Sequence, residues 1–326
     1  MPALAAHAER WPLATAFVIS RGAKTEAEVV VAEIGADAHR GRGEAVPYGR
    51  YGETVESVLA QIDAARGKIE AGAGRAELQA LLPAGAARNA LDCALWDLEA
   101  KRAGARAWTL AGVARLDPVK TCFTISLGSV DEMAASARAN ARRPMLKMKI
   151  AGADDLDAVA AVRAAAPRAR LIVDANEALA FDDLRRLAPE LARLDVKLLE
   201  QPLPAAEDAV LEGYESPLPL CADESLHTRA ELADCARRYD IVNVKLDKAG
   251  GLTEAIVLAD AARAAGLGLM VGCMVATSLA MAPALILAQG APFVDLDGPL
   301  LLKRDREPGL SILGSLIEPP PPELWG

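Results

Sequence analysis

The sequence predicts an α/β protein built on a closed parallel barrel. From about residue 120 onward, short apolar runs alternate with Ala-rich amphipathic segments. This βαβ alternation is typical of a parallel barrel rather than an antiparallel sandwich. No GxGxxG motif follows any of the apolar runs, which disfavours a doubly wound open sheet. The chain has 326 residues, 52% of them hydrophobic, enough for one large core or two unequal ones.

The first third of the chain has a different pattern. Two strand-like runs cover Ala16 to Ser20 and Glu28 to Ile34. A helix is expected over ARNALDCALWDLEAKRAG, with charged residues opposite an apolar face and Gly104 as its stop signal. The apolar face consists of Leu91, Ala94, Leu95 and Leu98.

Eight barrel strands are expected in the rest of the chain. They begin near residues 121, 144, 170, 197, 218, 240, 267 and 293. Intervals of roughly two dozen residues suit one βα unit each. The last stretch, Leu301 to Gly326, is Pro-rich near its end and is expected to pack back onto the N-terminal part.

Composition favours a small-molecule ligand. The formal charge of −9, with basic residues scattered among more numerous acids, argues against a nucleic-acid partner. The five cysteines form no CxxC or Cys/His pairing, so we expect free thiols in a reducing cytoplasm rather than a zinc site. No long apolar stretch or signal peptide is recognisable, so membrane insertion and export are not expected.

Three carboxylates fall at the carboxyl ends of successive predicted strands: Asp174, Glu200 and Asp223. Barrel enzymes place their active sites at this end, where the three side chains would converge. Oxygen ligands without nearby His or Cys favour Mg²⁺, or Mn²⁺, over Zn²⁺. The alternative is that each carboxylate is separately solvated or salt-bridged.

Two lysines flank these strands in the predicted barrel order. Lys149 ends the second strand, beside Lys147, and Lys245 belongs to the sixth. A lysine acts as a base at neutral pH only if burial or neighbouring positive charge lowers its pKa, and for Lys149 the metal and Lys147 would provide that charge. The alternative is that the lysines pair with the carboxylates, which would raise their pKa values.

These residues suit removal of a proton α to a carboxylate. A divalent ion stabilises the enediolate where its charge develops, and a lysine on each side of the substrate permits reprotonation from the opposite face. Removal of the proton from one face and reprotonation from the other invert the configuration of the α-carbon. If the second lysine only stabilises charge, elimination or cycloisomerisation results, so the residues leave both outcomes open.

The ordered segments KMK, LIVDAN, LLEQP, CADES and NVKLDKAGG resemble the muconate-cycloisomerase subgroup of the enolase superfamily. The resemblance covers nearly the whole chain and includes RNALDCALWDLEAKRAG, similar to a capping-domain helix, and GRGEAVPYGRYGETVESV, similar to a capping-domain loop. It implies an α+β capping domain (residues 1–115, completed by 301–326) and a modified TIM barrel, (β/α)7β, over residues 116–300. It also implies one Mg²⁺ per subunit on Asp174, Glu200 and Asp223, and acid/base roles for Lys149 and Lys245.

Within this superfamily, VGCMVATSLA and DLDGP resemble dipeptide epimerases, most closely the L-Ala-D/L-Glu epimerases of murein peptide recycling. The resemblance implies that Asp295 and Asp297 bind the free ammonium of a dipeptide, and that Lys147 and Met274 belong to the substrate site. A carboxylate pair suits an ammonium, which N-acylated amino acids and muconate lack. The alternative is that Arg304 or Lys303 cages the pair.

The segment SRGAKTEA places Arg21 and Lys24 in a capping loop, where either would pair with the side-chain carboxylate of a substrate such as Ala-Glu. Related Ala-Glu epimerases often have arginine where Lys24 stands, and lysine makes no bidentate fork. Cycloisomerisation, o-succinylbenzoate synthesis and N-acylamino acid racemisation remain alternatives, as does a non-catalytic barrel. Superfamily relatives suggest a homo-oligomer by analogy.

Overall fold

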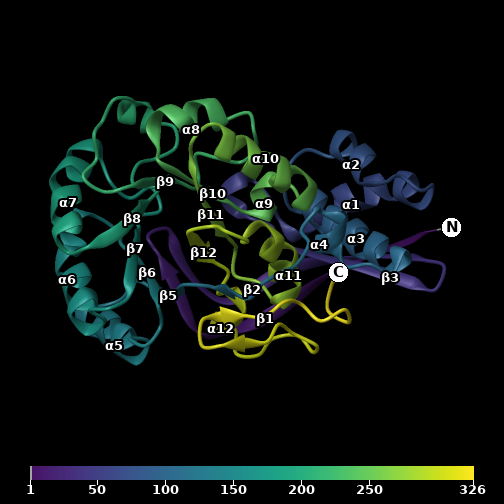
Figure 1. The fold of residues 1–326 in the computed structure, drawn as a ribbon, viewed down its shortest axis with the longest axis horizontal. Coiled ribbons are helices and arrows are strands. Elements are labelled where there is room, and N and C mark those ends of the chain that lie inside the picture. The colour runs from purple at the N-terminus through teal and green to yellow at the C-terminus, as the bar shows by residue number, and fades with distance from the viewer. Residues whose placement is uncertain (1) are drawn as a thin grey trace.

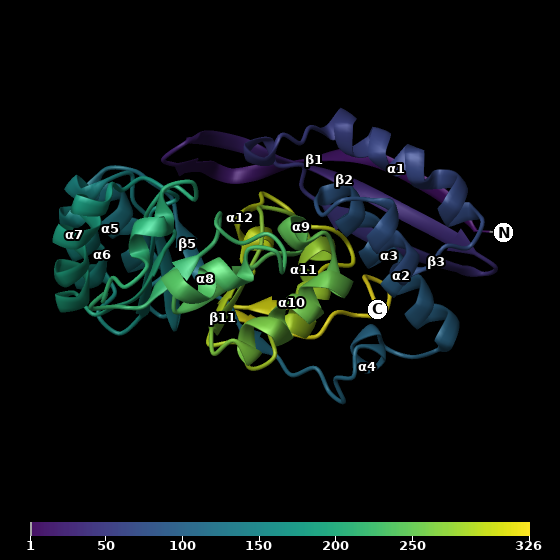
Figure 2. The same ribbon diagram turned by 90° about the horizontal axis from the view of Figure 1, so that it is seen from above.

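The computed structural model describes residues 2–326, which form two parts side by side (Figure 1). One part is an antiparallel sheet with helices packed on it, and the other is a parallel barrel ringed by helices. From above, the antiparallel sheet extends across one end of the barrel (Figure 2). Within the described residues, no helix combines the length and the apolar character needed to cross a bilayer.

The antiparallel sheet consists of β1 (Ala3–Ile19), β2 (Gly22–Ala36) and β3 (His39–Ala45). The two predicted strands are present, but both were predicted too short, because β1 and β2 pair along a long hairpin. The predicted loop SRGAKTEA is the tight end of this hairpin, and Lys24 lies on β2, opposite Phe17. The sequence analysis missed β3, whose glycines and charges lack strand alternation.

The glycines of β3 allow a helix to lie directly on the strand. A Cβ atom on Gly43 would come within 2.1 Å of the Ala90 carbonyl oxygen, and one on Gly41 within 2.1 Å of the Ala94 carbonyl oxygen. Both carbonyls belong to α3, so the helix backbone touches the sheet. The helical segments here are η1 (Gly49–Tyr51), α1 (Val55–Glu70), α2 (Arg75–Leu81), α3 (Ala86–Ala103) and α4 (Ala107–Leu110).

The predicted helix is α3, and Gly104 ends it in the left-handed conformation at φ 60°. Its apolar face packs on the sheet, as the spacing predicts. The opposite face is also buried, although Arg88, Asn89 and Asp92 lie on it. These polar side chains meet the barrel, a contact that amphipathic spacing alone does not reveal.

The eight predicted barrel strands are confirmed. They pair in parallel and in sequence order: β5 (Phe123–Ile125), β6 (Met145–Lys149), β7 (Arg170–Asp174), β8 (Val196–Glu200), β9 (Leu220–Ala222), β10 (Ile241–Val244), β11 (Gly268–Gly272) and β12 (Phe293–Asp295). Cys122, just before β5, donates its backbone N–H to the Val294 oxygen of β12 at 2.9 Å. This bond brings the first and last strands together and nearly closes the barrel.

Helices follow most strands on the outside of the barrel (Figure 1). They are η2 (Ala153–Asp155), α5 (Val130–Ala139), α6 (Leu156–Ala165), α7 (Phe181–Arg193), η3 (Asp208–Leu211), α8 (Leu232–Arg238), α9 (Leu246–Ala249), α10 (Leu252–Ala264), α11 (Ser278–Leu287) and α12 (Gly298–Leu301). Only the short 3₁₀ turn η3 follows β8. Pro202 and Pro204 stand directly after this strand, and proline disfavours a helix at its own and the preceding position.

Successive inward-facing residues form two layers inside the barrel. The lower layer is apolar and takes one residue from or next to each strand: Cys122, Met145, Ile172, Leu198, Cys221, Ile241, Met270 and Phe293. Because side chains alternate along a strand, the residues two positions later face the same way. These form the upper layer: Thr124, Lys147, Asp174, Glu200, Asp223, Asn243, Gly272 and Asp295. The change from apolar to charged residues marks the functional end of the barrel.

The end of the chain contacts both parts of the molecule. β13 (Ile312–Leu313) and β14 (Leu316–Ile317) form a small antiparallel sheet with β4 (Val119–Lys120) next to the barrel. Trp325 is fully buried, and its Nε1 donates to the Cys93 carbonyl of α3 at 3.0 Å. Residues near the C-terminus are thus anchored on the helical layer of the antiparallel sheet.

Candidate active site

The upper layer opens into a cavity of about 380 Å³ between the barrel and the β1–β2 hairpin. Its walls combine charged barrel residues with apolar and basic residues of the hairpin, and a volume of this order accommodates a small ligand. The cavity contains eight of the predicted site residues: Arg21, Lys24, Lys147, Lys149, Lys245, Met274, Asp295 and Asp297. The predicted metal ligand Asp223 also lines it.

The predicted metal carboxylates lie on three neighbouring strands. In the parallel register Lys149 faces Asp174, and Asp174 faces Glu200, so these residues lie at one level. Asp223 directly follows β9, the next strand in the barrel. All three carboxylates are at most 2% exposed, as expected where strand register brings side chains together at the barrel mouth.

Four lysines neutralise these carboxylates in the structure. Lys149 Nζ lies 2.6 Å from Asp174 Oδ2, and Lys245 Nζ lies 2.7 Å from Asp223 Oδ2. Lys147 Nζ lies 2.9 Å from Asp174 Oδ2 and 2.7 Å from Glu200 Oε2, while Lys248 Nζ lies 2.6 Å from Asp223 Oδ1. The ion pairing that the sequence left open as an alternative is therefore present.

The pairs shift the pKa values of their members. Burial by itself lowers the pKa of Lys245, but the carboxylates of Asp223, Glu200 and Glu224 together outweigh burial and hold it well above the ordinary value. Burial raises the pKa of Asp174, but Lys147 and Lys149 outweigh it and lower the pKa to about 2. Glu200 behaves differently, because burial and the charge of Asp174 raise its pKa to about 7. In this arrangement Lys245 is a protonated acid rather than a base.

Several buried oxygens at the mouth suit a cation with oxygen ligands. Within residues 2–326, Asn176 Oδ1, Glu224 Oε2 and Asn243 Oδ1 have no hydrogen-bond donor, and Glu200 Oε2 has only the Lys147 ammonium, at 2.7 Å. Buried oxygens without donors are costly unless a cation satisfies them. With the carboxylates of Asp174 and Asp223 they form an oxygen-only donor set, which fits Mg²⁺ rather than Zn²⁺.

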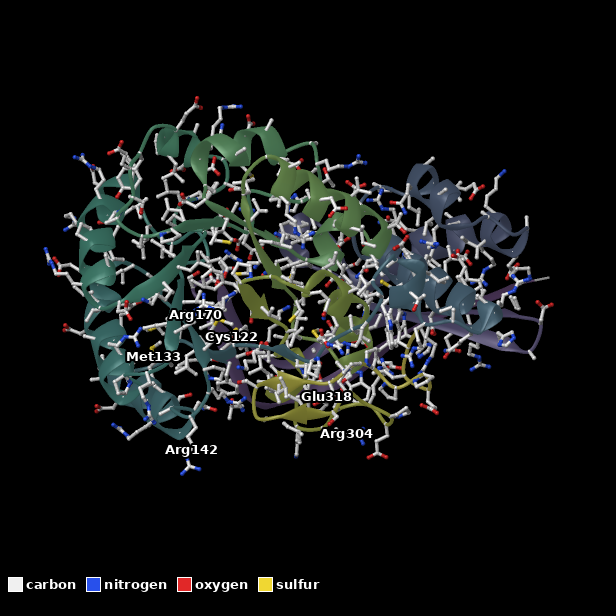
Figure 3. All side chains as sticks on the ribbon, in the orientation of Figure 1. Cys122, Met133, Arg142, Arg170, Arg304 and Glu318 are labelled. Atoms are coloured by element: carbon white, nitrogen blue, oxygen red, sulfur yellow. The ribbon has the colours of Figure 1, made fainter. Side chains whose placement is uncertain are left out.

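The tightest group of acidic and thiol side chains lies beside the predicted metal residues. Among the described residues, Cys122, Asp295 and Asp297 have ligand atoms within 4.8 Å of one another, whereas Asp174, Glu200 and Asp223 do not form such a group. The Lys147 ammonium lies within 2.9 Å of oxygens of both Asp174 and Glu200. Figure 3 shows Cys122 inside the barrel, close to the centre of the molecule.

Asp295 and Asp297 face the cavity from the end of β12. Asp295 accepts from Cys122 Sγ at 3.0 Å and from Lys147 Nζ at 2.8 Å, and Asp297 Oδ2 accepts from the Thr124 backbone N–H at 2.6 Å. Burial and the charge of Asp295 raise the pKa of Asp297 to about 7. Such a carboxylate is stabilised in its ionised form by an added positive charge.

Arg304 does not pair with Asp295 and Asp297, which the sequence had left open as an alternative. The Arg304 guanidinium lies over the Trp11 ring, 5.8 Å from its centroid. Figure 3 places Arg304 near the outer edge of the C-terminal segment, away from Cys122 in the barrel interior. Asp295 instead pairs with Lys147, and Asp297 accepts from the Thr124 backbone N–H.

Arg21 and Lys24 reach the cavity from the hairpin. Arg21 is exposed but paired, because Nη2 donates to Glu224 Oε1 at 2.8 Å and Nη1 donates to the Asn176 carbonyl at 2.8 Å. These contacts join the hairpin to the ends of β7 and β9. Lys24 is exposed as well, and its Nζ lies 5.4 Å from the centroid of the Tyr48 ring.

Sequence reasoning missed some site residues. Lys248 is buried and forms an ion pair with Asp223. From the sequence alone, this lysine looks like a surface residue. Glu177 forms ion pairs with both Arg21 and Arg50. Asn243 Nδ2 donates a hydrogen bond to Glu200 Oε1 at 2.8 Å. The signal that identifies Asn243 is its position, two residues before Lys245 on the inward face of β10.

Two family models match the chain. Residues 3–112 match the N-terminal domain of the mandelate racemase and muconate lactonizing enzymes, and residues 130–305 match the enolase C-terminal domain-like family. An L-Ala-D/L-Glu epimerase of Escherichia coli K12 is 50% identical over 93% of this chain and 95% of its own length. An N-acetyl-D-glutamate racemase of a Pseudoalteromonas species is 43% identical over 88% and 91%.

Solved structures agree with these relatives. An enolase family member of Agrobacterium tumefaciens with homology to dipeptide epimerases is 51% identical, covers all of both chains and superposes with a TM-score of 0.99. It was solved with sodium and L-Ala-L-Glu. A dipeptide epimerase of Methylococcus capsulatus, solved with Mg and L-Arg-D-Lys, is 32% identical over 98% of this chain and 97% of its own, with a TM-score of 0.89.

Proposed function

The chain belongs to the mandelate racemase and muconate lactonizing enzyme family of the enolase superfamily, and from this premise we propose that it is a Mg²⁺-dependent L-Ala-D/L-Glu epimerase. The observation that carries the proposal is the placement of Lys149 and Lys245 on opposite sides of three buried carboxylates in one cavity. The enzyme inverts the α-carbon of the glutamate residue, which lies beside the free carboxylate of the dipeptide.

Two lysines account for inversion by a 1,1-proton transfer. The neutral amine of one lysine removes the α-proton from one face and leaves an enediolate. The ammonium of the other lysine then delivers a proton to the opposite face, and the two exchange roles in the reverse direction. Lys149 ends β6 and Lys245 directly follows β10, with β7 to β9 between them, and these positions suit attack from two sides.

Asp174, Glu200 and Asp223 would hold the Mg²⁺, which supplies positive charge beside the substrate carboxylate where negative charge develops. Coordination of the ion by Asp223 would weaken the ion pair that raises the pKa of Lys245 and would favour the neutral amine of this lysine.

The two ends of the substrate would meet opposite charges. Asp295 and Asp297 receive the ammonium of the alanine residue, and Arg21 or Lys24 pairs with the glutamate side chain from the hairpin. Met274, 9% exposed on the cavity wall, packs against the substrate. The buried charge of Lys147 lowers the pKa of Asp295 and keeps that carboxylate ionised.

One relative favours a second candidate, the racemisation of N-acylated glutamate. Such a substrate has no ammonium to occupy the aspartate pair, so we place it second. The test is to incubate the purified protein and Mg²⁺ with L-Ala-L-Glu, other L,L-dipeptides and N-acetyl-L-glutamate, and to separate the products by chiral chromatography. Epimerisation of Ala-Glu but not of N-acetylglutamate supports the proposal, and the reverse preference selects the second candidate.

We further propose that residues 1–115 and 301–326 form the capping domain and that residues 116–300 form the catalytic barrel. The contacts of Trp325 with α3 support the inclusion of the C-terminal segment in the cap. A cytoplasmic location, a homo-oligomeric assembly and a role in murein peptide recycling are part of the same proposal. All five cysteines are free thiols in the described structure, as a reducing compartment requires.

A further inference from the structure

The one-turn helix α9 fixes the backbone of Lys245. Lys245 is the residue immediately before α9, and its carbonyl accepts the Ala249 N–H at 3.0 Å. Gly250 N–H then donates to the Leu246 carbonyl at 2.8 Å. Because α9 is a single turn, any shift of its far end moves the Cα atom of Lys245 as well.

The capping helix α3 is hydrogen-bonded to the start of α9 through Asp247. Asn89 Nδ2 donates to Asp247 Oδ1 at 2.9 Å, and the Val46 backbone N–H donates to the same oxygen at 2.9 Å. Both side chains are buried, Asn89 to 2% and Asp247 to 8% exposure. Asp247 therefore points away from the substrate, toward the cap.

The same helix is hydrogen-bonded to the other end of α9 through Arg88. Its Nη2 donates to the Ala249 carbonyl at 2.7 Å and its Nε to the Gly250 carbonyl at 3.0 Å. A guanidinium at the carbonyl end of a helix satisfies oxygens that have no partner within the helix. Gly250 has φ 77°, and a Cβ there would lie 2.5 Å from Arg88 Nε, so glycine makes this close approach possible.

Lys149 is supported differently. It ends β6 inside the barrel sheet, in register with Asp174 of β7, and its ammonium is paired with Asp174. Its backbone is thus held by strand pairing within the barrel. The two proposed acid/base lysines differ in whether the cap supports them.

We propose that Asn89 and Arg88 of the capping helix are positioning residues for Lys245, so that the cap aligns one of the two acid/base lysines as well as covering the substrate. This inference rests on the proposed function, because it concerns one face of the same reaction. Proton transfer is sensitive to distance, and a displacement of about 1 Å costs roughly 100-fold in rate. Weaker hydrogen bonds between α3 and α9 therefore slow proton transfer at the face of the substrate that Lys245 serves.

The test compares α-proton exchange from L-Ala-L-Glu and L-Ala-D-Glu in deuterated water. The variants Lys149→Ala and Lys245→Ala first establish which epimer each lysine deprotonates. Asn89→Leu removes the donor to Asp247 but leaves a buried side chain of similar size. We expect exchange to fall at least about tenfold for the Lys245 epimer and less than about twofold for the Lys149 epimer.

Asp97→Asn is the matched control. Asp97 is a fully buried acid on the same helix, but it accepts from Arg42, Lys101 and Gly326 rather than from α9. Loss of stability alone leaves the ratio of the two exchange rates unchanged, and we expect that result for Asp97→Asn. Asp247→Asn keeps an oxygen for Asn89 and Val46, and we expect it to preserve the wild-type ratio.

An equal fall in both rates for Asn89→Leu, or an unchanged ratio, would overturn the inference. If Asn89→Leu does not fold, Arg88→Lys provides the same test, because lysine loses the two-point contact with α9. Absence of exchange in the wild-type protein would overturn the proposed function instead. In that case a crystal structure of the folded variant decides the inference: displacement of α9 and Lys245 supports it, and an unmoved Lys245 rejects it.

Discussion

Lys147 Nζ lies 2.8 Å from Asp295 Oδ2, which connects β6 to the end of β12 across the barrel interior. The same ammonium is within 2.9 Å of Asp174 and Glu200 oxygens. One buried cation thus lies between the proposed metal carboxylates and the proposed ammonium site. Its charge lowers the pKa values of Asp174 and Asp295 against the effect of burial, and this permits two anionic groups to coexist in one small cavity.

Asp297→Asn should weaken the binding of a free dipeptide. The variant loses a buried carboxylate that would face the substrate ammonium, and loss of one member of such a pair costs about 2 kcal/mol or more, roughly 30-fold in affinity. Binding of L-Ala-L-Glu to the Mg²⁺-loaded protein can be measured by calorimetry. N-acetyl-L-Ala-L-Glu, which has no ammonium, serves as the control ligand, and equal affinities of wild type and variant for the free dipeptide would reject this role for Asp297.

Glu200→Gln should weaken metal binding at least about tenfold, because the amide removes the negative charge of a fully buried proposed ligand. Calorimetric titration of the chelator-treated protein with Mg²⁺ measures this directly, without reference to activity. Glu215→Gln removes an exposed carboxylate and should leave the affinity unchanged. Equal Mg²⁺ affinity of the Glu200 variant and the wild type would place the metal elsewhere.

Asp247→Asn should change how stability depends on pH. Burial raises the pKa of Asp247 to about 7, against about 3.9 in a model peptide. Between these values the folded protein binds more protons than the unfolded chain, so this group makes the wild type less stable as pH rises from about 4 to about 7. The difference corresponds to at most about 4 kcal/mol.

The asparagine variant lacks this titration. Relative to the wild type, it should therefore gain stability from pH 5 to pH 8, as measured by urea unfolding at each pH with Mg²⁺ present. The comparison cancels the titration of all other groups that the two proteins share. A stability difference that stays constant over this range would mean that Asp247 is ionised throughout in the folded protein.

Gly43→Ala should destabilise the protein by about 2 kcal/mol or more, because its Cβ would meet the Ala90 carbonyl at 2.1 Å and force α3 from β3. Gly67→Ala is the matched control within α1, where a Cβ has open space. Alanine at an open helix position is expected to stabilise by about 0.5–1 kcal/mol. Thermal or urea unfolding should thus give changes of opposite sign, and equal effects would contradict the close contact of α3 with β3.

The barrel was predictable because each strand is a short apolar run with a polar end, and strand register then places Lys149, Asp174 and Glu200 on one level. Positions of this kind depend on local pattern and register. The hairpin of β1 and β2 was only partly predictable. Its strands pair with a register shift between Pro12 and Phe17, which interrupts the alternation that identifies a strand.

Other features depend on contacts between segments far apart in the chain. Arg88 and Asn89 look like the solvent-facing side of an amphipathic helix, and only the packing of α3 on α9 shows that they are buried. Lys248 is buried for a similar reason, because α9 turns it toward Asp223. Burial of a polar residue by a distant segment has no local sequence signal.

The central claim is that Lys149 and Lys245 transfer protons on opposite faces of the substrate. The most direct measurement follows deuterium incorporation by mass spectrometry when Lys149→Ala and Lys245→Ala are each incubated with L-Ala-L-Glu and L-Ala-D-Glu in deuterated water with Mg²⁺. We expect that neither variant epimerises and that each exchanges the α-proton of one epimer only, with opposite preferences. Epimerisation by either variant, or exchange of the same epimer by both, would contradict it.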